Sequence, residues 1–238
     1  MEDKETILLE FIHELMILLP QLNTSAAFIS KATQGKPDIP SLVINADNIL
    51  EATELINTQL TLLNIGLNPE FYLIQKKQPV NIHGSFIRCS KFLKGRTRVK
   101  NLQIYTRRVN QESIPMVETI TVINAIPFII LDNSIKYSPK GSSIDIEFAK
   151  SNDKIEISIS SEGPKVYSEE ISKLTEKNYR SKNAAEVNPD GKGLGLYYLK
   201  TICDLCKVDF SITSANKGYQ FENIEYSTFT VLLKISLN

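Results

Sequence analysis

Three polar side chains in an otherwise apolar stretch, residues 124–141, have the spacing of residues on one face of a helix. Asn133, Lys136 and Tyr137 stand three and four residues apart, which places them on the same side of a helix. An amide oxygen suits Mg²⁺, an ammonium group suits a phosphate, and a tyrosine ring can lie at the edge of a nucleotide base. The stretch therefore indicates a helix that holds a metal nucleotide, and the alternative is the solvated face of an amphipathic helix.

Two glycine-containing stretches follow this predicted helix. Residues 160–166 are expected to end a strand in a turn that contains Gly163, and residues 191–196 open a helix with alternating glycines. Glycine at a helix N-terminus allows backbone N–H groups to approach a polyphosphate. The polar residues 167–190 between the two stretches are long enough to form a lid over a ligand.

His13 and Glu14 form a second candidate for chemistry near the start of the chain. A neutral imidazole is nucleophilic, and an adjacent carboxylate can accept its second proton while the ring attacks a phosphoryl group. The pair therefore offers a phosphoacceptor, and the alternative is a surface histidine without a role. We assign no role to His83, the only other histidine in the sequence.

Two heptad patterns predict long helices in the first part of the chain. Apolar residues are separated alternately by four and three positions over residues 8–29 and again over residues 42–67, as in a packed helix seam. A Gly/Pro break at residues 34–37 favours an antiparallel hairpin. One hairpin cannot cover both of its apolar stripes, so we expect a four-helix bundle in a homodimer, formed through residues 1–68. The seam residues are Leu8, Ile12, Leu15, Leu19, Leu22, Ala26 and Ile29, then Leu42, Ala46, Ile49, Thr53, Ile56, Leu60, Leu63 and Leu67.

Beyond Pro69 the pattern changes to that of a mixed α/β domain, which we place at residues 75–238. Helices beside a mostly antiparallel sheet form a two-layer α/β sandwich, so the predicted fold class is α+β. We expect helices over 121–137 and 194–206, and strands over 101–109, 143–148, 154–160, 209–213 and 227–235.

Composition narrows the function classes. The 238 residues carry a formal net charge of zero, which leaves no electrostatic footprint for nucleic acid. No stretch approaches the roughly 20 apolar residues of a membrane span, so we expect a soluble, cytoplasmic protein without such a span. Cys203 and Cys206 form a lone CxxC, which favours packed thiols over a zinc or redox site.

Taken in order, these segments resemble the histidine kinase core, whose ATP-binding domain shares a superfamily with gyrase, the Hsp90 chaperones and MutL. Residues 131–138 resemble the N box, residues 161–164 the first glycine box and residues 191–196 the second. Tyr179–Arg180 resembles the aromatic–arginine pair of the lid, and residues 227–231 resemble the closing strand. Several motifs in this order make chance similarity improbable.

The resemblance implies roles for individual residues around ATP. Asn133 would ligand the Mg²⁺ that bridges the phosphates, Lys136 would neutralise phosphate charge, and Tyr137 would pack near the ribose and base. Arg180 would reach the transferring phosphoryl group, so that catalysis consists of positioning and charge neutralisation. The other residues that it places at the nucleotide are Ser161, Gly163, Gly191, Gly193, Leu194, Gly195 and Leu196.

The hairpin resembles the dimerisation and phosphotransfer domain of the same family, and His13–Leu15 is similar to the start of its H box. The resemblance implies a histidine kinase that binds Mg-ATP, phosphorylates His13 with Glu14 as the base, and passes the phosphoryl group to the receiver domain of a response regulator. Only a dozen residues precede His13, so we expect no sensor in the chain and signal input from a separate sensor protein.

Several positions depart from the family pattern and keep two other functions open. Ser161 stands where an aspartate or asparagine normally accepts from the adenine amino group, Lys165 replaces the second glycine of that box, and Ile129 replaces an asparagine. In the H box, residues 16–18 are apolar. The alternatives are a histidine phosphotransferase or scaffold with a decayed ATP site, and an ATP-binding switch without phosphotransfer if His13 is inert.

Overall fold

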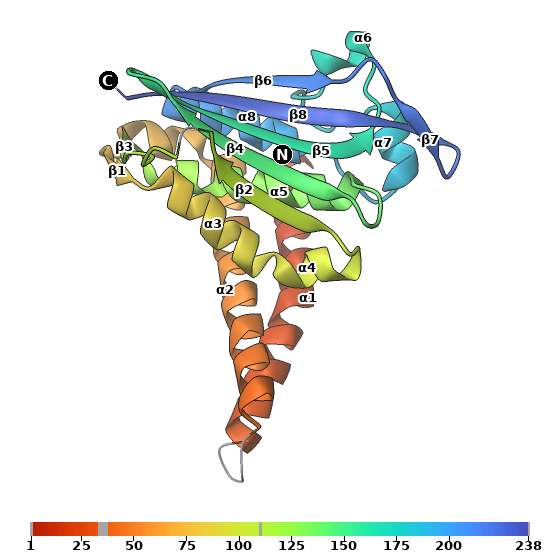
Figure 1. The fold of residues 1–238 in the computed structure, drawn as a ribbon. Helices are drawn as coiled ribbons and strands as arrows, with labels where there is room; N and C mark the ends of the chain where they lie inside the picture. Colours follow the sequence, from red (N-terminus) through yellow and green to blue (C-terminus); the bar gives the residue numbers. More distant parts are fainter. Residues whose placement is uncertain (1, 33–37, 110, 238) are drawn as a thin grey trace. The chain divides into compact units, whose positions relative to one another are not determined.

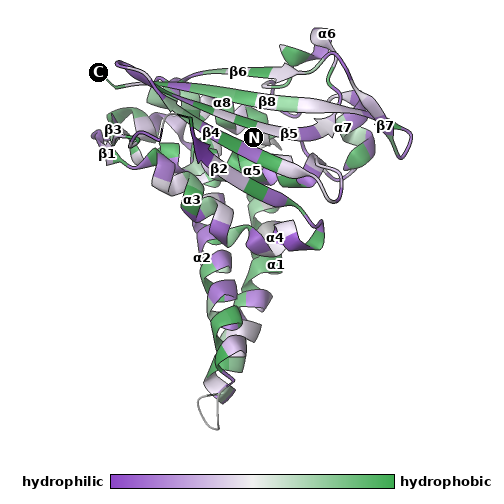
Figure 2. Ribbon diagram, in the orientation of Figure 1, coloured by the Kyte–Doolittle hydropathy of each residue, from purple (hydrophilic) through white to green (hydrophobic). Residues whose placement is uncertain are grey.

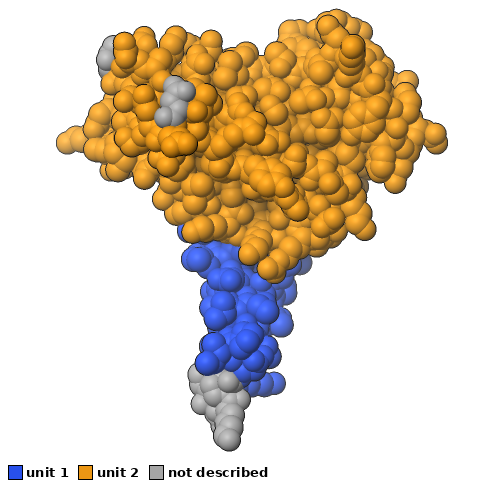
Figure 3. All heavy atoms as spheres, in the orientation of Figure 1, with its two compact units in different colours: residues 1–71 blue, residues 72–238 orange. Residues whose placement is uncertain are grey.

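The structure is a computed structural model that describes residues 2–32, 38–109 and 111–237; the expected break at residues 34–37 lies outside them. The side chain of Glu14 is also outside the described part. Backbone contacts divide the chain into two compact units, residues 1–71 and residues 72–238 (Figure 3). Each unit is therefore described by itself.

The first unit is a pair of long helices, α1 (Glu2–Ala32) and α2 (Ile39–Leu67), which pack along each other (Figure 1). Asp38 caps α2 by accepting a hydrogen bond from the Ser41 backbone N–H at 3.3 Å, and a proline follows within the first turn. The end of α2 is followed by Asn68 and a short 3₁₀ helix, η1 (Pro69–Ile74). The predicted pair of helices is thus present.

The contact between α1 and α2 uses only half of the predicted seam on α1. Leu15 and Leu22 are half-buried as expected, but Ile12 and Leu19 are 43% and 46% exposed. Leu18, which was not predicted, is buried. The apolar stripe is wider than one helix contact, and the single neighbour α2 covers only one side of it. The predicted seam residues that are exposed are Leu8, Ile12, Leu19 and Ala26 on α1, and Ala46, Thr53 and Leu60 on α2.

Apolar residues consequently remain exposed along both helices of the hairpin. Figure 2 shows that hydrophobic residues are distributed along both helices. The large ones are Leu8, Leu9, Ile12, Met16, Ile17, Leu19, Phe28, Ile39, Val43, Ile44, Leu50 and Leu60. No helix in the described ranges combines the length and the apolar character that crossing a bilayer requires.

The second unit is built on a six-stranded sheet. Its edge strand β2 (Gln103–Arg108) runs parallel to β4 (Ser143–Lys150), and every other pairing is antiparallel. The order after β4 is β5 (Lys154–Pro164), β8 (Ile224–Ser236) and β6 (Asp209–Ser214), and β7 (Tyr219–Phe221) pairs with the start of β8. The mostly antiparallel sheet is as predicted.

Helices cover one face of this sheet, and the core lies between the two layers (Figure 1). They are α3 (Ile82–Phe92), α5 (Ile126–Tyr137) and α8 (Gly195–Cys206). Alternate residues of β4 and β5 are buried, as expected for strands with one covered face. On α3, Phe86 and His83 meet the ring of Phe148 edge-on, with ring centroids 5.6 and 4.8 Å apart. The predicted α+β fold class is confirmed.

The first glycine stretch is not the turn that the sequence predicted. Strand β5 continues to Pro164, with Ser161 opposite Phe229 and Gly163 opposite Ser227. The reason is that β8 begins at Ile224, earlier than expected, and supplies backbone partners for the extension. A small residue such as Gly163 is tolerated in a strand when a partner strand satisfies its backbone groups.

Other elements also differ from the prediction. The helix expected from residue 121 begins as a 3₁₀ turn, η2 (Thr121–Ala125), and α5 starts only at the proline-containing first turn. The turn between β7 and β8 has positive φ at Glu222 and Asn223, 48° and 65°, which is the geometry of a tight type I′ hairpin. The further short elements are β1 (Gln78–Val80), which pairs with β3 (Val117–Thr119), and the helices α4 (Lys94–Val99), α6 (Ser168–Ile171) and α7 (Lys182–Val187).

Candidate functional site

The second half of α5 presents one polar face. Asn133 and Tyr137 are half-buried and Lys136 is exposed, whereas the other residues of the helix are buried. These residues lie three and four positions apart, so they point to the same side. The structure therefore leaves the three side chains predicted to hold the nucleotide partly or fully exposed.

Lys136 has a partner on its own helix. Its Nζ lies 2.7 Å from Oδ2 of Asp132, and Oδ1 of the same carboxylate lies 2.6 Å from Nη1 of Arg96. Because Asp132 is only 8% exposed, its charge needs such compensation. Lys100 donates to the carbonyl oxygens of Lys136 at 2.6 Å and Ser138 at 3.2 Å, where a cation is favourable at a helix C-terminus. Burial lowers the pKa of Lys100.

Sequence reasoning missed Asp132, Arg96 and Lys100 as parts of this site. One signal was available for Asp132, because an acidic residue four positions before a lysine on a helix is a standard ion-pair spacing. The contacts of Arg96 and Lys100 bridge 36 residues of sequence, so no local pattern could reveal them.

The second glycine stretch meets both α5 and the lid, residues 167–190. A Cβ built on Gly191 would lie 3.1 Å from Oη of Tyr137 and 3.1 Å from Nη2 of Arg180. Four residues later, a Cβ on Gly195 would lie 3.9 Å from Cγ2 of Ile129 on α5. The fold thus brings Tyr137 close to Arg180 and Gly191, which follow it much later in the sequence.

Gly193 has a backbone that only glycine accommodates. Its φ is +70°, and a Cβ would lie 2.5 Å from the carbonyl oxygen of Tyr179 and 2.7 Å from the carbonyl carbon of Asn178. A left-handed φ favours glycine, and contacts this short exclude any side chain. In the structure this glycine therefore allows the stretch before α8 to pack against the lid backbone.

Arg180 is bound to the lid itself. Its guanidinium donates to the carbonyl oxygens of Pro189 at 3.0 Å, Ala184 at 3.1 Å and Asn188. These carbonyls lie at the end of α7, where a cation offsets unpaired acceptors. The buried Nε has no hydrogen-bond partner among the described residues.

Ser161 and Gly163 lie on strand β5. Ser161 is buried and lies on the same strand face as Ile157 and Ile159, which form the core below the sheet. A Cβ on Gly163 would make an ordinary contact, 3.7 Å from Cβ of Phe229. The Ser161 hydroxyl thus faces the side of the sheet on which α5 lies.

His13 is exposed on α1, in the first unit. It lies next to Ile12 and near Met16, which are also exposed. An exposed imidazole is accessible to a reacting group.

Leu194 and Leu196 flank the start of α8 and are half-buried.

The donor groups fit a metal that arrives with a nucleotide. Within the described ranges, no group of three or more His, Cys, Asp or Glu side chains could hold a metal ion. Mg²⁺ bound to a nucleotide needs only one or two protein oxygens, because phosphates and water supply the others. The amide of Asn133, on the uncovered face of α5, can supply such an oxygen.

The chain is similar in sequence to a known protein family and to curated proteins. Residues 125–236 match the family model described as Histidine kinase-, DNA gyrase B-, and HSP90-like ATPase. The histidine protein kinase SaeS of Staphylococcus epidermidis is 29% identical over 209 residues, which cover 82% of this chain and 57% of that protein. The chain thus spans somewhat more than half the length of this curated relative.

Solved structures share the fold at low sequence identity. The catalytic domain of histidine kinase ThkA aligns with a TM-score of 0.53 and 14% identity, over 68% of this chain and 97% of that chain. A crystal structure of ThkA in complex with the response regulator protein TrrA aligns with a TM-score of 0.52 and 16% identity, over 100% of this chain and 64% of that chain. At these identities the likeness concerns the fold.

Proposed function

We propose that this chain, which carries an ATPase domain of the histidine kinase, DNA gyrase B and HSP90 family, binds Mg-ATP beside α5 and transfers its γ-phosphoryl group to His13. One observation supports the ATP site above all others: the uncovered face of α5 lies where Tyr137 meets Gly191 and Arg180. A metal ligand, a phosphate-binding lysine and a glycine backbone at one place are the parts that phosphoryl transfer needs.

Each residue has a distinct task in this proposal. The Asn133 amide would hold Mg²⁺, which would neutralise phosphate charge, and the Lys136 ammonium would exchange its ion pair with Asp132 for one with phosphate. Tyr137 borders the ribose and base, and the Ser161 hydroxyl accepts from the adenine amino group. ATP supplies the phosphoryl group, and the chain contributes position and charge.

The phosphoacceptor step uses the hairpin. A neutral ring nitrogen of His13 attacks the γ-phosphorus, the new N–P bond forms as the bond to the ADP oxygen breaks, and Glu14 accepts the second ring proton. The exposure of His13 supports this role.

The proposal includes two protein partners. A second copy of the chain would cover the exposed apolar residues of α1 and α2, giving a four-helix bundle. The receiver domain of a response regulator would then take the phosphoryl group from His13; the solved complex of ThkA with TrrA, which shares the fold, supports this choice. Signal input would come from a sensor.

Labelling with ATP and Mg²⁺ tests the proposal. The chain should acquire label that is lost in acid and kept in base, the behaviour of a phosphohistidine. His13→Gln should abolish labelling while nucleotide binding persists, and Glu14→Gln should slow it by roughly 10²- to 10⁴-fold, as for a lost general base. Unchanged labelling in His13→Gln would refute the assignment of the phosphoacceptor.

A second function, a phosphotransferase or scaffold with a decayed ATP site, is favoured by one specific arrangement. Both cations expected at the phosphates, Lys136 and Arg180, are engaged by the protein's own oxygens. If calorimetry shows no heat with millimolar ATP and Mg²⁺, but the chain accepts phosphate from a phosphorylated receiver domain, this function replaces the kinase. ATP binding without any labelling would instead indicate a switch.

A further inference from the structure

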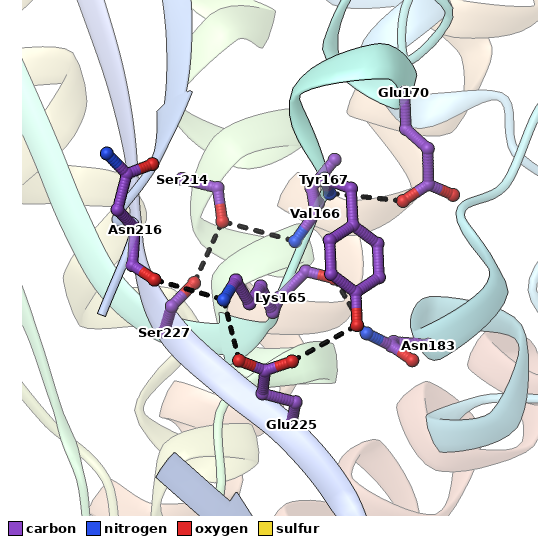
Figure 4. A network of polar contacts seen from close by, with 9 residues as sticks. All are labelled: Lys165, Val166, Tyr167, Glu170, Asn183, Ser214, Asn216, Glu225 and Ser227. Atoms are coloured by element: carbon purple, nitrogen blue, oxygen red, sulfur yellow. Dashed lines mark hydrogen bonds and ion pairs between the residues drawn. The ribbon is translucent and has the colours of Figure 1, made fainter. Parts of the chain in front are cut away.

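Lys165, two residues before the lid, makes an ion pair with the β7–β8 hairpin (Figure 4). Lys165 Nζ lies 2.6 Å from Oε1 of Glu225 and donates to the carbonyl oxygen of Asn216 at 3.0 Å. The hydroxyl of Tyr167 donates to the other carboxylate oxygen of Glu225 at 3.1 Å, and its ring centroid is 5.7 Å from Nζ. We call Lys165, Tyr167 and Glu225 the lid anchor.

The lid anchor is partly shielded from solvent. The Lys165 side chain is 17% exposed and that of Glu225 is 26% exposed, so water and salt screen the pair less than a surface pair. The hydrogen bond from Lys165 holds the pKa of Glu225 below its ordinary value. The backbone N–H of Lys165 also donates to the Glu225 carbonyl at 2.7 Å, which fixes the two strands at this point.

Backbone groups at the anchor extend the connection into the lid (Figure 4). Asn183 of α7 donates to the carbonyl oxygen of Lys165 at 2.8 Å. The N–H of Val166 donates to Ser214 Oγ at 3.1 Å, and that hydroxyl lies 2.8 Å from Ser227 Oγ. The far half of the lid is thus tied to Lys165, two residues before the lid begins.

Glu170 connects the two helices of the lid. Its carboxylate accepts hydrogen bonds from the Tyr167 N–H at 3.1 Å, the Tyr179 hydroxyl at 3.3 Å and the Lys182 N–H at 3.2 Å. The lid therefore has its own internal polar connections, and the anchor joins this connected segment to the sheet.

Few apolar residues pack at this end of the lid. Neither α6 nor α7 contains a buried residue, whereas Val166 beside the anchor and Leu174 after α6 are both buried. A cavity of about 340 Å³ lies beneath the lid base. Its lining includes Lys165, Tyr167, Ser214 and Asn216. Burial of apolar area is the main source of packing stability, so Val166 and Leu174 contribute to the position of the lid base together with the polar contacts.

We infer that Lys165 and Glu225 are positioning residues that hold the lid in an ordered conformation before a nucleotide binds. In the resemblance described above, Lys165 occupies a glycine position, and glycine has no side chain with which to make this pair. A pre-ordered lid lowers the ordering cost of nucleotide binding, because apparent affinity scales with the fraction of chains already in the competent conformation. The consequence for ATP rests on the function proposed above, whereas the order of the lid does not.

Amide hydrogen exchange of the full chain without nucleotide tests the anchor. Glu225→Gln keeps the size of the side chain and removes its charge, and we expect exchange across residues 168–188 to rise by roughly 10-fold through local opening. Lys165→Met should give the same pattern. The charge-reversed pair Lys165→Glu with Glu225→Lys should restore part of the slow exchange, because it returns the ion pair but not the hydrogen bonds to Asn216 and from Tyr167. A purely steric role would show no such rescue.

Glu156→Gln is the matched control, because Glu156 pairs with Lys234 at 3.7 Å on β5 and β8, away from the lid. It should leave lid exchange unchanged. Wild-type exchange across the lid in Glu225→Gln, or no recovery in the charge-reversed pair, would overturn the inference. Should Lys165→Met fail to fold, Glu225→Gln and the reversed pair still decide the outcome.

Nucleotide binding separates this inference from the proposed function. In the anchor variants the KM for ATP should rise several-fold while kcat stays near that of the wild type, because the chemical step uses other residues. If the wild type binds no ATP, the proposed function fails, and the exchange experiment still reports on the anchor. If lid exchange rises without any change in KM, the order of the lid does not serve nucleotide binding and that part of the inference is wrong.

Discussion

At the scale of single residues, the cations of the candidate site are held by the protein's own oxygens. Asp132 pairs with Lys136 through one carboxylate oxygen and with Arg96 through the other. Arg180 donates to three carbonyl groups at the end of α7. A phosphate must compete with these oxygens for the two cations. The Ser161 hydroxyl is uncharged and shorter than the aspartate side chain that normally accepts from the adenine amino group. Affinity for ATP should therefore be modest, and single substitutions should change it measurably.

Ser161→Asp should tighten ATP binding by about 1–2 kcal/mol, the gain of a charge-assisted hydrogen bond over a neutral one. Calorimetry with Mg²⁺ measures this, and Asn133→Ala should abolish the heat in either background. Ser158→Asp is the matched control, because residue 158 lies on the opposite face of β5 from the buried Ser161. Equal affinities in wild type and Ser161→Asp would contradict the assignment of Ser161 to the adenine.

The two cysteines of α8 should be unreactive in the native protein. Burial raises the pKa of the Cys203 thiol and raises that of Cys206 to about 11, so at pH 8 only about 0.1% of Cys206 is thiolate. Alkylation followed by mass spectrometry should be roughly 100-fold slower at Cys206 than at an exposed thiol, and fast in denaturant. Rapid native labelling at either position would revive a redox role for the CxxC.

At the scale of elements, the lid and the second glycine stretch pack against each other. The lid backbone at Tyr179 lies against Gly193, while the lid base is held by the anchor on the β7–β8 hairpin. Neither contact is local in sequence. The position of the lid is therefore a property of three elements together: α8, the lid and the hairpin.

Gly193→Ala should destabilise the lid more than an equally strained substitution elsewhere. Its Cβ would lie 2.5 Å from the Tyr179 carbonyl oxygen, and we expect a loss of about 2–3 kcal/mol and weaker ATP binding. Gly141→Ala is the control, because Gly141 has φ +84° but no heavy atom within 4 Å of its Cβ; it should cost about 1 kcal/mol. Thermal or denaturant unfolding measures both, and equal losses would show that the lid contact contributes nothing.

At the scale of the whole molecule, the exposed apolar residues of α1 and α2 are the reason to expect a dimer. A hairpin that exposes this much apolar surface gains by pairing, at about 1.5–3 kcal/mol for each large side chain buried. The contacts of the hairpin itself use other residues, among them Leu18, Ala52 and Leu55. Assembly and hairpin packing can therefore be perturbed separately.

Leu19→Asp combined with Leu60→Asp should convert the expected dimer into a monomer. Both leucines are exposed at 46%, so the charges would enter the bundle without entering the contact between α1 and α2. Light scattering should give twice the 26.8 kDa chain mass for the wild type and the chain mass for the variant. Asn23→Asp, at an exposed polar position of α1, is the control and should remain dimeric. A monomeric wild type at micromolar concentration would exclude the bundle.

The sequence by itself determined the features that depend on local spacing. Periodicity of four and three identified both helices of the hairpin, alternation identified the central strands, and the i, i+3, i+4 spacing placed Asn133, Lys136 and Tyr137 on one face of α5. These features follow from backbone geometry within a few residues, so no distant partner is needed to specify them.

Only the tertiary structure decided the features that depend on partners distant in sequence. It showed which side of the wide apolar stripe on α1 meets α2, because the pattern permits either side. It extended β5 through Ser161, because β8 supplies hydrogen-bond partners 68 residues later (Phe229). It also paired Lys165 with Glu225 and Asp132 with Arg96, since side chains brought together by folding interact through space whatever their separation along the chain.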